Sequence, residues 1–163
     1  MARRRRIAVL GGYVVHLSGE VLGGGMSLPP AVIAQLRALQ EQLIAVGDIW
    51  WLPEDLARYP GKKDRFCLVV ALEYPAGGSG VSPLVHYVVG STSSSVSKTI
   101  KVRAGESGLN EDTYFRFWWS GSIAGTTVAE NGKWKGRLAE PRGPEIEAAI
   151  RASKLAALKR LLP

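Results

Sequence analysis

The chain has 163 residues, a net charge of +7 and a single cysteine, Cys67. This length suits one domain with some additional chain, and the charge is compatible with a nucleic-acid partner without requiring one. One cysteine excludes an intrachain disulfide, one cysteine with two histidines argues against a zinc site, and no apolar run approaches the ~20 residues of a membrane helix. We therefore expect a cytoplasmic protein that has no metal or other cofactor and no membrane segment.

Residues 1–46 are interpreted as an extension that precedes the main domain. The segment Arg3–Arg6 and the apolar residues after it superficially resemble a signal peptide, but glycines and a histidine interrupt the apolar part and no clear cleavage site follows. We interpret residues 1–25 as a basic, flexible tail, with an arm that contacts nucleic acid as the alternative. An amphipathic helix is predicted over about residues 30–45, because prolines open it and apolar residues recur every three or four positions.

Short strands are predicted to follow one another from residue 47 onward. Branched and aromatic residues favour strands over the ranges 47–52, 65–70, 84–89, 99–103 and 113–119. In the last of these, alternate residues should lie on opposite faces of the strand. One face would carry Tyr114, Arg116 and Trp118, and the other Phe115, Phe117 and Trp119.

The C-terminal part of the chain is predicted to hold a hairpin and a helix. Asn131 and Gly132 form a strong hairpin signal between strands over residues 126–130 and 133–138. A final helix begins near Pro144 and extends to about residue 162, with acidic residues in its first turn and basic residues in its last, as the helix dipole favours. The expected fold class is therefore mainly β with helices: a small SH3-like barrel over residues 47–163, which closes to remove exposed strand edges, with a C-terminal helix and an N-terminal helical extension.

Two polar clusters are expected where strands end. Lys62, Lys63 and Arg65 lie in or directly after the loop between the first two strands, and a basic group on a rigid strand end suits an anion. The alternative is a solvated loop with ordinary surface lysines. The turn over residues 90–95 is rich in Ser and Thr, whose hydroxyls bond either to nearby backbone or to a phosphate. Lys101 and Arg103 share one strand face and could continue a phosphate-binding surface.

Four segments in order resemble the MazF/PemK toxin family. Gly47–Trp50 resembles the opening strand of that family, and Arg65–Val70 resembles its second strand, which an arginine precedes. Tyr87–Ser93 resembles its third strand and hydroxyl turn, and Val102–Leu109 resembles a Gly-containing turn that precedes another strand. The resemblance covers about residues 47–162. It departs from the family at Phe66 and Gly90, where family members carry prolines.

The resemblance implies an activity and a set of partners. Members of this family are small barrels, usually homodimers, that cut single-stranded RNA without a metal. An antitoxin with an acidic, flexible tail holds them inactive, and they contact DNA only through it. Carried over by motif, the reactive pair is Arg65 and Thr92, with Ser91 as the alternative to Thr92. The residues that would contact RNA are Lys62, Lys63, Ser91, Ser93, Lys101 and Arg103.

In the reaction implied by the resemblance, the RNA 2′-hydroxyl attacks the adjacent phosphate and leaves a 2′,3′-cyclic phosphate and a 5′-hydroxyl. The nucleophile is intramolecular, so the protein must add charge stabilisation, for which the planar fork of Arg65 is suited. Arginine is a poor base near neutral pH, so His86 is the candidate for proton transfer, with Asp64 and Glu73 as alternatives and a purely structural strand histidine as the competing interpretation.

Aromatic side chains could complete the RNA site, and two other functions compete with it. Trp51, Tyr87 or Trp118 could stack on unpaired bases, although most of the tryptophans are expected in the core. The main alternative function is a non-catalytic barrel that binds a protein or a nucleic acid. A gyrase-poisoning toxin is a third possibility that rests on fold analogy alone.

Overall fold

The computed structural model describes residues 7–10, 13–16, 29–35, 44–57, 65–76, 82–93 and 99–162, with backbone only for 7–10, 13–16 and Glu140. Within these residues the chain is mainly β, as predicted. A two-stranded antiparallel sheet pairs β1 (Ile7–Leu10) with β2 (Tyr13–His16), and a six-stranded antiparallel sheet has the order β6-β7-β5-β4-β3-β8.

Six strands and several short helices make up the main domain. The strands are β3 (Asp48–Leu52), β4 (Arg65–Glu73), β5 (Leu84–Ser91), β6 (Thr99–Val102), β7 (Thr113–Ala124) and β8 (Lys133–Arg137). The helices are α2 (Glu54–Ala57), η1 (Glu106–Gly108), α3 (Gly125–Asn131), η2 (Glu140–Arg142), α4 (Gly143–Ala152) and α5 (Ala156–Lys159). No helix in the described parts of the chain has the length and apolarity that crossing a membrane requires.

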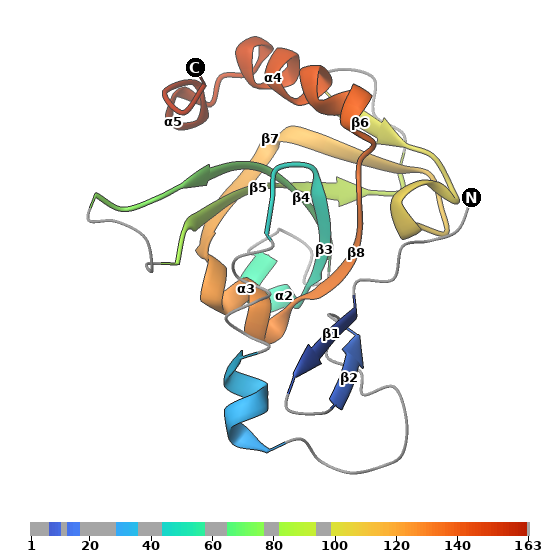
Figure 1. Cartoon of the computed structure of the whole chain (residues 1–163). Helices are drawn as coiled ribbons and strands as arrows, with labels where there is room; N and C mark the ends of the chain where they lie inside the picture. The colour runs from blue at the N-terminus through green and yellow to red at the C-terminus, as the bar shows by residue number, and fades with distance from the viewer. Residues whose placement is uncertain are drawn as a thin grey trace.

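The large sheet is strongly curved and is covered on both faces (Figure 1). One core cluster joins Phe115 and Leu68 of the sheet to Ile146 of α4, so α4 and α5 cover this face. The second cluster joins Cys67 and other strand residues to Val128 of α3, so α2 and α3 cover the opposite face. Because both faces are buried, the central strands β4 and β5 read as nearly continuous apolar runs.

The turn η1 brings the two outermost strands of the sheet together. Ser107 Oγ donates a hydrogen bond to the carbonyl oxygen of Arg137 at 3.0 Å, which links the end of β6 to β8. Gly108 has φ of +78° and lies so close to the carbonyl of Lys135 that no side chain would fit, and Gly136 faces the carbonyl of Ser107 in the same way. Close packing of glycine backbone therefore joins η1 to β8.

The predicted hairpin around Asn131 and Gly132 is wrong, because residues 125–131 form the helix α3. Gly132 follows the last turn of this helix, and its N–H donates to the carbonyl of Val128 at 2.8 Å. The β-branched residues of this segment favour a strand, but a helix lets Val128 and Ala129 reach the second core cluster or its edge. Tertiary burial has overridden local propensity here.

Three other differences concern the ends of the chain. Residues 7–16 include the hairpin β1–β2, where a flexible tail was expected. Residues 30–35 are helical as predicted, residues 36–43 lie outside the described part, and residues 44 and 45 are no longer helical. The C-terminal helix is interrupted after α4, because Ser153 Oγ donates to the carbonyl of Ile150 at 2.7 Å and accepts from the N–H of Leu155 at 3.2 Å.

Cys67 lies in the second core cluster and is 1% exposed. Burial raises the pKa of its thiol well above the ordinary range, although the charge of Arg65 acts in the opposite direction. Because the thiolate is the reactive form, we expect iodoacetamide to label the native protein far more slowly than the denatured protein. Mass spectrometry of labelled samples with and without guanidinium would measure this, and equal rates in the two would contradict the buried position.

Candidate functional site

The start of β4 and the end of β5 lie side by side at one end of the sheet. Cys67 pairs with Val89, and this antiparallel register, continued by two residues, places Arg65 opposite Ser91. Ser91 pairs with Tyr114 on β7, and Tyr114 pairs with Lys101 on β6. Residues directly opposite each other across antiparallel strands have their Cβ atoms about 5 Å apart. We call Arg65, Ser91, Tyr114 and Lys101 the Arg65 row.

The Arg65 row lies on the face of the sheet that carries the second core cluster. Cys67 and Val89 belong to that cluster, and Arg65 and Ser91 are two residues from them along their strands, so they project to the same side. Thr92 lies one residue beyond β5, in an exposed bend. The register therefore places Ser91, the alternative to Thr92, beside Arg65.

Arg116 fixes the Ser-rich turn to the sheet. Its Nη2 donates to the carbonyl oxygen of Ser93 at 3.0 Å and to Ser93 Oγ at 2.9 Å. Ser93 Oγ is 2.8 Å from Ser91 Oγ, which also accepts from the N–H of Ser93 at 3.3 Å. Arg116 pairs with Val89 and so lies one pleat from Tyr114, on the face of the Arg65 row. Sequence reasoning placed Arg116 on the correct strand face but missed this link, because only the fold brings β7 to the turn.

Two tryptophans surround the Arg116 guanidinium. Its Cζ lies 4.4 Å from the ring centroid of Trp119 and 5.8 Å from that of Trp118, so both rings are in range for a cation–π interaction. The prediction that Trp119 shares a face with Phe115 and Phe117 is wrong. The register shifts between Val88 and Val89, and this irregularity brings both tryptophans to Arg116.

Lys101 is already engaged by an acidic partner. Its Nζ lies 2.6 Å from Asp112 Oδ2 and 5.4 Å from the ring centroid of Tyr114. The hydrogen bond from Lys101 lowers the pKa of Asp112, and the same bond raises the pKa of Lys101. Both side chains are more than two-fifths exposed, so the pair is screened by water and can open for a phosphate.

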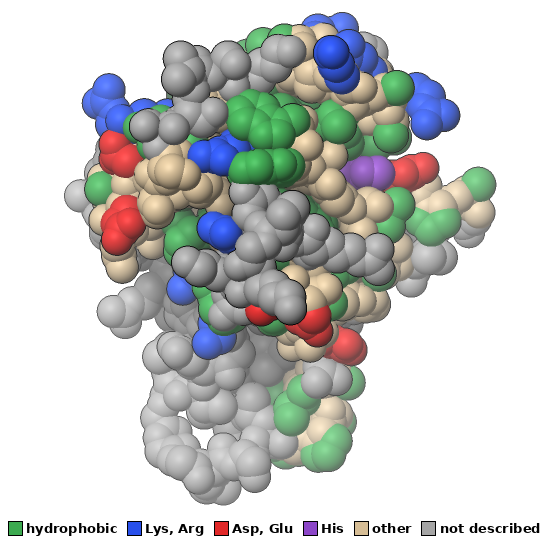
Figure 2. Space-filling view, turned by 180° about the vertical axis from the view of Figure 1, so that it is seen from behind, with side chains coloured by type: hydrophobic (Ala, Val, Ile, Leu, Met, Phe, Trp, Pro, Cys, Tyr) green, Lys and Arg blue, Asp and Glu red, His purple; other side chains and the backbone are tan. Residues whose placement is uncertain are grey.

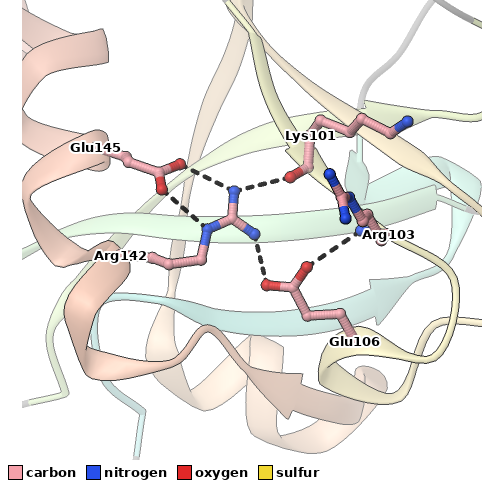
Figure 3. A pocket seen from close by; sticks show the side chains of 5 residues that line it. All are labelled: Lys101, Arg103, Glu106, Arg142 and Glu145. Carbon is pink, nitrogen blue, oxygen red and sulfur yellow. Dashed lines mark hydrogen bonds and ion pairs between the residues drawn. The ribbon is translucent and has the colours of Figure 1, made fainter.

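Arg103 directly follows β6. It lines an open pocket together with Glu106, Arg142 and Glu145, and there Lys101 supplies its carbonyl oxygen while its ammonium points away (Figure 3). Arg142 donates to Glu106 Oε1 at 2.5 Å, to Glu145 Oε2 at 2.9 Å and to the Lys101 carbonyl at 2.7 Å. The hydrogen bonds of Arg142 therefore join β6, η1 and α4. The carboxylates of Glu106 and Glu145 disfavour binding of a phosphate in this pocket.

His86 is distant from the Arg65 row, which argues against the proton-transfer role considered from the sequence. It lies on β5 six residues before Thr92, a distance of about 20 Å along a strand. Alternation also places it on the face opposite to Ser91. Its Nε2 is 2.9 Å from Glu73 Oε2 and its ring is largely buried, so a structural role fits it.

Of the three aromatic residues considered for base stacking, Trp118 is placed best. Tyr87 is 2% exposed, and its hydroxyl donates to the carbonyl of Leu56 at 3.1 Å. Trp51 pairs with Phe66, whose face is opposite to that of Arg65, and Lys133 lies over its ring. Trp118 is 43% exposed. Figure 2 shows hydrophobic side chains (green) next to basic side chains (blue) on the face of the molecule that it presents.

Two further predictions from the sequence concern the residues directly before β4 and the metal-binding capacity of the chain. Lys62, Lys63 and Asp64 lie outside the described residues. Among the described residues, no three side chains of His, Cys, Asp or Glu are grouped as a metal site would need. The described candidate site is therefore an arrangement of arginines, hydroxyls and aromatic rings at one end of the sheet.

Gly90 is required by close packing at this end of the sheet. An added Cβ would lie 2.7 Å from Thr113 Cγ2 and 2.9 Å from Phe115 Cε1, and both residues are buried. We expect Gly90→Ala to lower the free energy of unfolding by about 1–3 kcal/mol, measured by urea denaturation. Gly143→Ala is the matched control, because a Cβ there meets no atom within 4 Å. Equal stability of the two variants would contradict this account.

The continued register thus sets Arg65 opposite the start of a hydroxyl turn that Arg116 holds in place, at the end of a sheet with a buried core cluster on each face. No protein-family model matches the chain, and no curated protein matches it.

Proposed function

We propose that the chain is an endoribonuclease toxin of the MazF/PemK type, and that its curved sheet is the SH3-like barrel of that family. One observation supports the proposal: Cys67 on β4 pairs with Val89 on β5. Continuing this pairing by two residues would set Arg65 opposite Ser91, as the family's reactive arginine and hydroxyl would require. The four ordered sequence segments support it independently.

In this proposal the Arg65 row binds the phosphate that is cut. Arg65 donates two hydrogen bonds to the phosphate oxygens, and the hydroxyl of Ser91 or Thr92 donates another. The RNA 2′-oxygen forms a bond to phosphorus, and the bond from phosphorus to the 5′-oxygen breaks. The proton of the 2′-hydroxyl ends on the 5′-oxygen. The protein lowers the barrier by positioning the phosphate and stabilising its developing charge, and the reaction needs no metal.

The proposal includes the setting that the family implies. The protein would act in the cytoplasm as a homodimer on single-stranded mRNA, and an antitoxin with an acidic, flexible tail would block the cationic site. Contact with DNA would occur only through that antitoxin. Opposite charge would steer the acidic tail to the site and make its binding sensitive to salt.

RNA cleavage by the purified chain tests the proposal directly. We expect single-stranded RNA to be cut in the presence of EDTA, and the downstream products to carry 5′-hydroxyl ends that polynucleotide kinase labels without prior phosphatase treatment. The upstream products should carry cyclic phosphates, detected by mass spectrometry. Activity that EDTA abolishes, or products with 5′-phosphates, would refute the proposed chemistry.

A non-catalytic barrel that binds nucleic acid is the second candidate. The existing hydrogen bonds of the turn favour it, because Ser91 and Arg116 are already engaged with Ser93. Intact RNA at high protein concentration, together with binding that weakens steeply as salt rises, would support this candidate and exclude the nuclease.

A further inference from the structure

The rings beside Arg116 suggest a second subsite next to the Arg65 row. Trp118 is one of the few large apolar side chains that the described part of the chain exposes, with 43% of its surface accessible. It lies on the same strand as Tyr114 and Arg116, and its ring is 5.8 Å from the Arg116 guanidinium. Aromatic rings next to cationic groups are the combination on which proteins that bind single-stranded nucleic acid stack bases.

The local structure holds the Trp118 ring in a defined position. Its ring centroid is 5.8 Å from that of Trp119, with the planes tilted by 59°. Trp119 packs on the second core cluster and contacts Arg116, which in turn is hydrogen-bonded to Ser93. The surface is therefore connected to the core below and to the hydroxyl turn beside it. A fixed aromatic ring loses little conformational entropy when a ligand stacks on it.

We propose that Trp118, supported by Arg116 and Trp119, is a stacking subsite for an unpaired nucleobase of the RNA strand whose phosphate lies on the Arg65 row. The proposal deepens the proposed function and rests on it for the identity of the ligand as single-stranded RNA. Every base has a π-face, so such a subsite tolerates sequence variation, whereas a paired base in a duplex could not enter it.

Binding of oligonucleotides that cannot be cleaved tests the subsite separately from catalysis. The probes are a fluorescent 2′-O-methyl oligouridine of about ten nucleotides and a strand of equal length that carries the same phosphates but no bases. We expect Trp118→Ala in the full chain to weaken binding of the oligouridine by about 5- to 150-fold, measured by anisotropy, and to leave binding of the base-free strand unchanged. Trp118→Phe should retain most of the affinity, because it keeps an aromatic face.

Tyr74→Ala is the matched control, because Tyr74 is exposed by 65% but lies just beyond the opposite end of β4. It should bind both strands as the unchanged protein does. The subsite is overturned if Trp118→Ala weakens neither strand or weakens both equally, or if the unchanged protein binds neither strand. If the expected pattern appears but RNA is never cut, the nuclease assignment fails while the subsite stands; if RNA is cut and Trp118→Ala binds normally, only the subsite fails.

Discussion

Arg65→Ala is expected to lower the rate of RNA cleavage by about 10²–10³-fold, the usual effect of removing one donor to a developing negative charge. Arg65 stands at the first position of β4, opposite Ser91 by register, and is half-buried. A guanidinium in such a position is less hydrated than one in open solvent, so its hydrogen bonds to a phosphate gain strength. Single-turnover cleavage of a labelled RNA would measure the rate.

Arg151→Ala is the control for charge alone. Arg151 is exposed in the last turn of α4, on the helix that covers the opposite face of the sheet. Its removal changes the net charge by the same amount and should change the rate by less than about threefold, because long-range charge is screened. Arg65→Lys should recover only part of the lost activity, since lysine keeps the charge and loses the planar fork. Full activity in folded Arg65→Ala protein would refute the assignment of Arg65.

Asp48→Asn is expected to lower the free energy of unfolding by about 3 kcal/mol, near the lower end of what breaking a buried ion pair costs. The Asp48 side chain is fully buried, and it accepts from Arg137 Nε at 2.7 Å and Nη2 at 3.0 Å. It also accepts from Trp134 Nε1 at 3.1 Å and from the N–H of Ala45 at 2.9 Å. An asparagine side chain would place its NH₂ group against some of these N–H donors, which would then lose their acceptor. Arg137 is 37% exposed and can rehydrate, which limits the loss.

Asp112→Asn provides the matched comparison for Asp48→Asn. Asp112 pairs with Lys101, and both side chains are more than two-fifths exposed, so losing this pair should cost no more than about 1 kcal/mol. Urea denaturation of the two variants should therefore separate them clearly. Equal decreases in the free energy of unfolding would show that the buried hydrogen bonds of Asp48, which link β3 to β8, stabilise the fold no more than the exposed Lys101–Asp112 pair does.

The sequence was sufficient to locate most of the strands. Alternating and continuous apolar residues predicted strands at 65–70, 84–89 and 113–119, and these appear as β4, β5 and β7, each longer than predicted. Such patterns are readable because side-chain burial repeats locally along a strand. The same local reasoning failed at residues 125–131, where β-branched residues belong to a helix that the core stabilises.

The sequence also identified Arg65 and the hydroxyl turn as polar groups at strand ends, but not which hydroxyl lies beside Arg65. That choice follows from the pairing of Cys67 with Val89, which a shift of one residue would reverse. The distance of His86 from the turn and the hydrogen bonds from Arg116 to Ser93 depend on the same register. The sequence by itself thus determined the strands and their chemistry, and the tertiary structure decided which groups meet. The physical reason is that propensity and alternation act between near neighbours in the chain, whereas register, irregular pairing and burial depend on partners that only folding brings together.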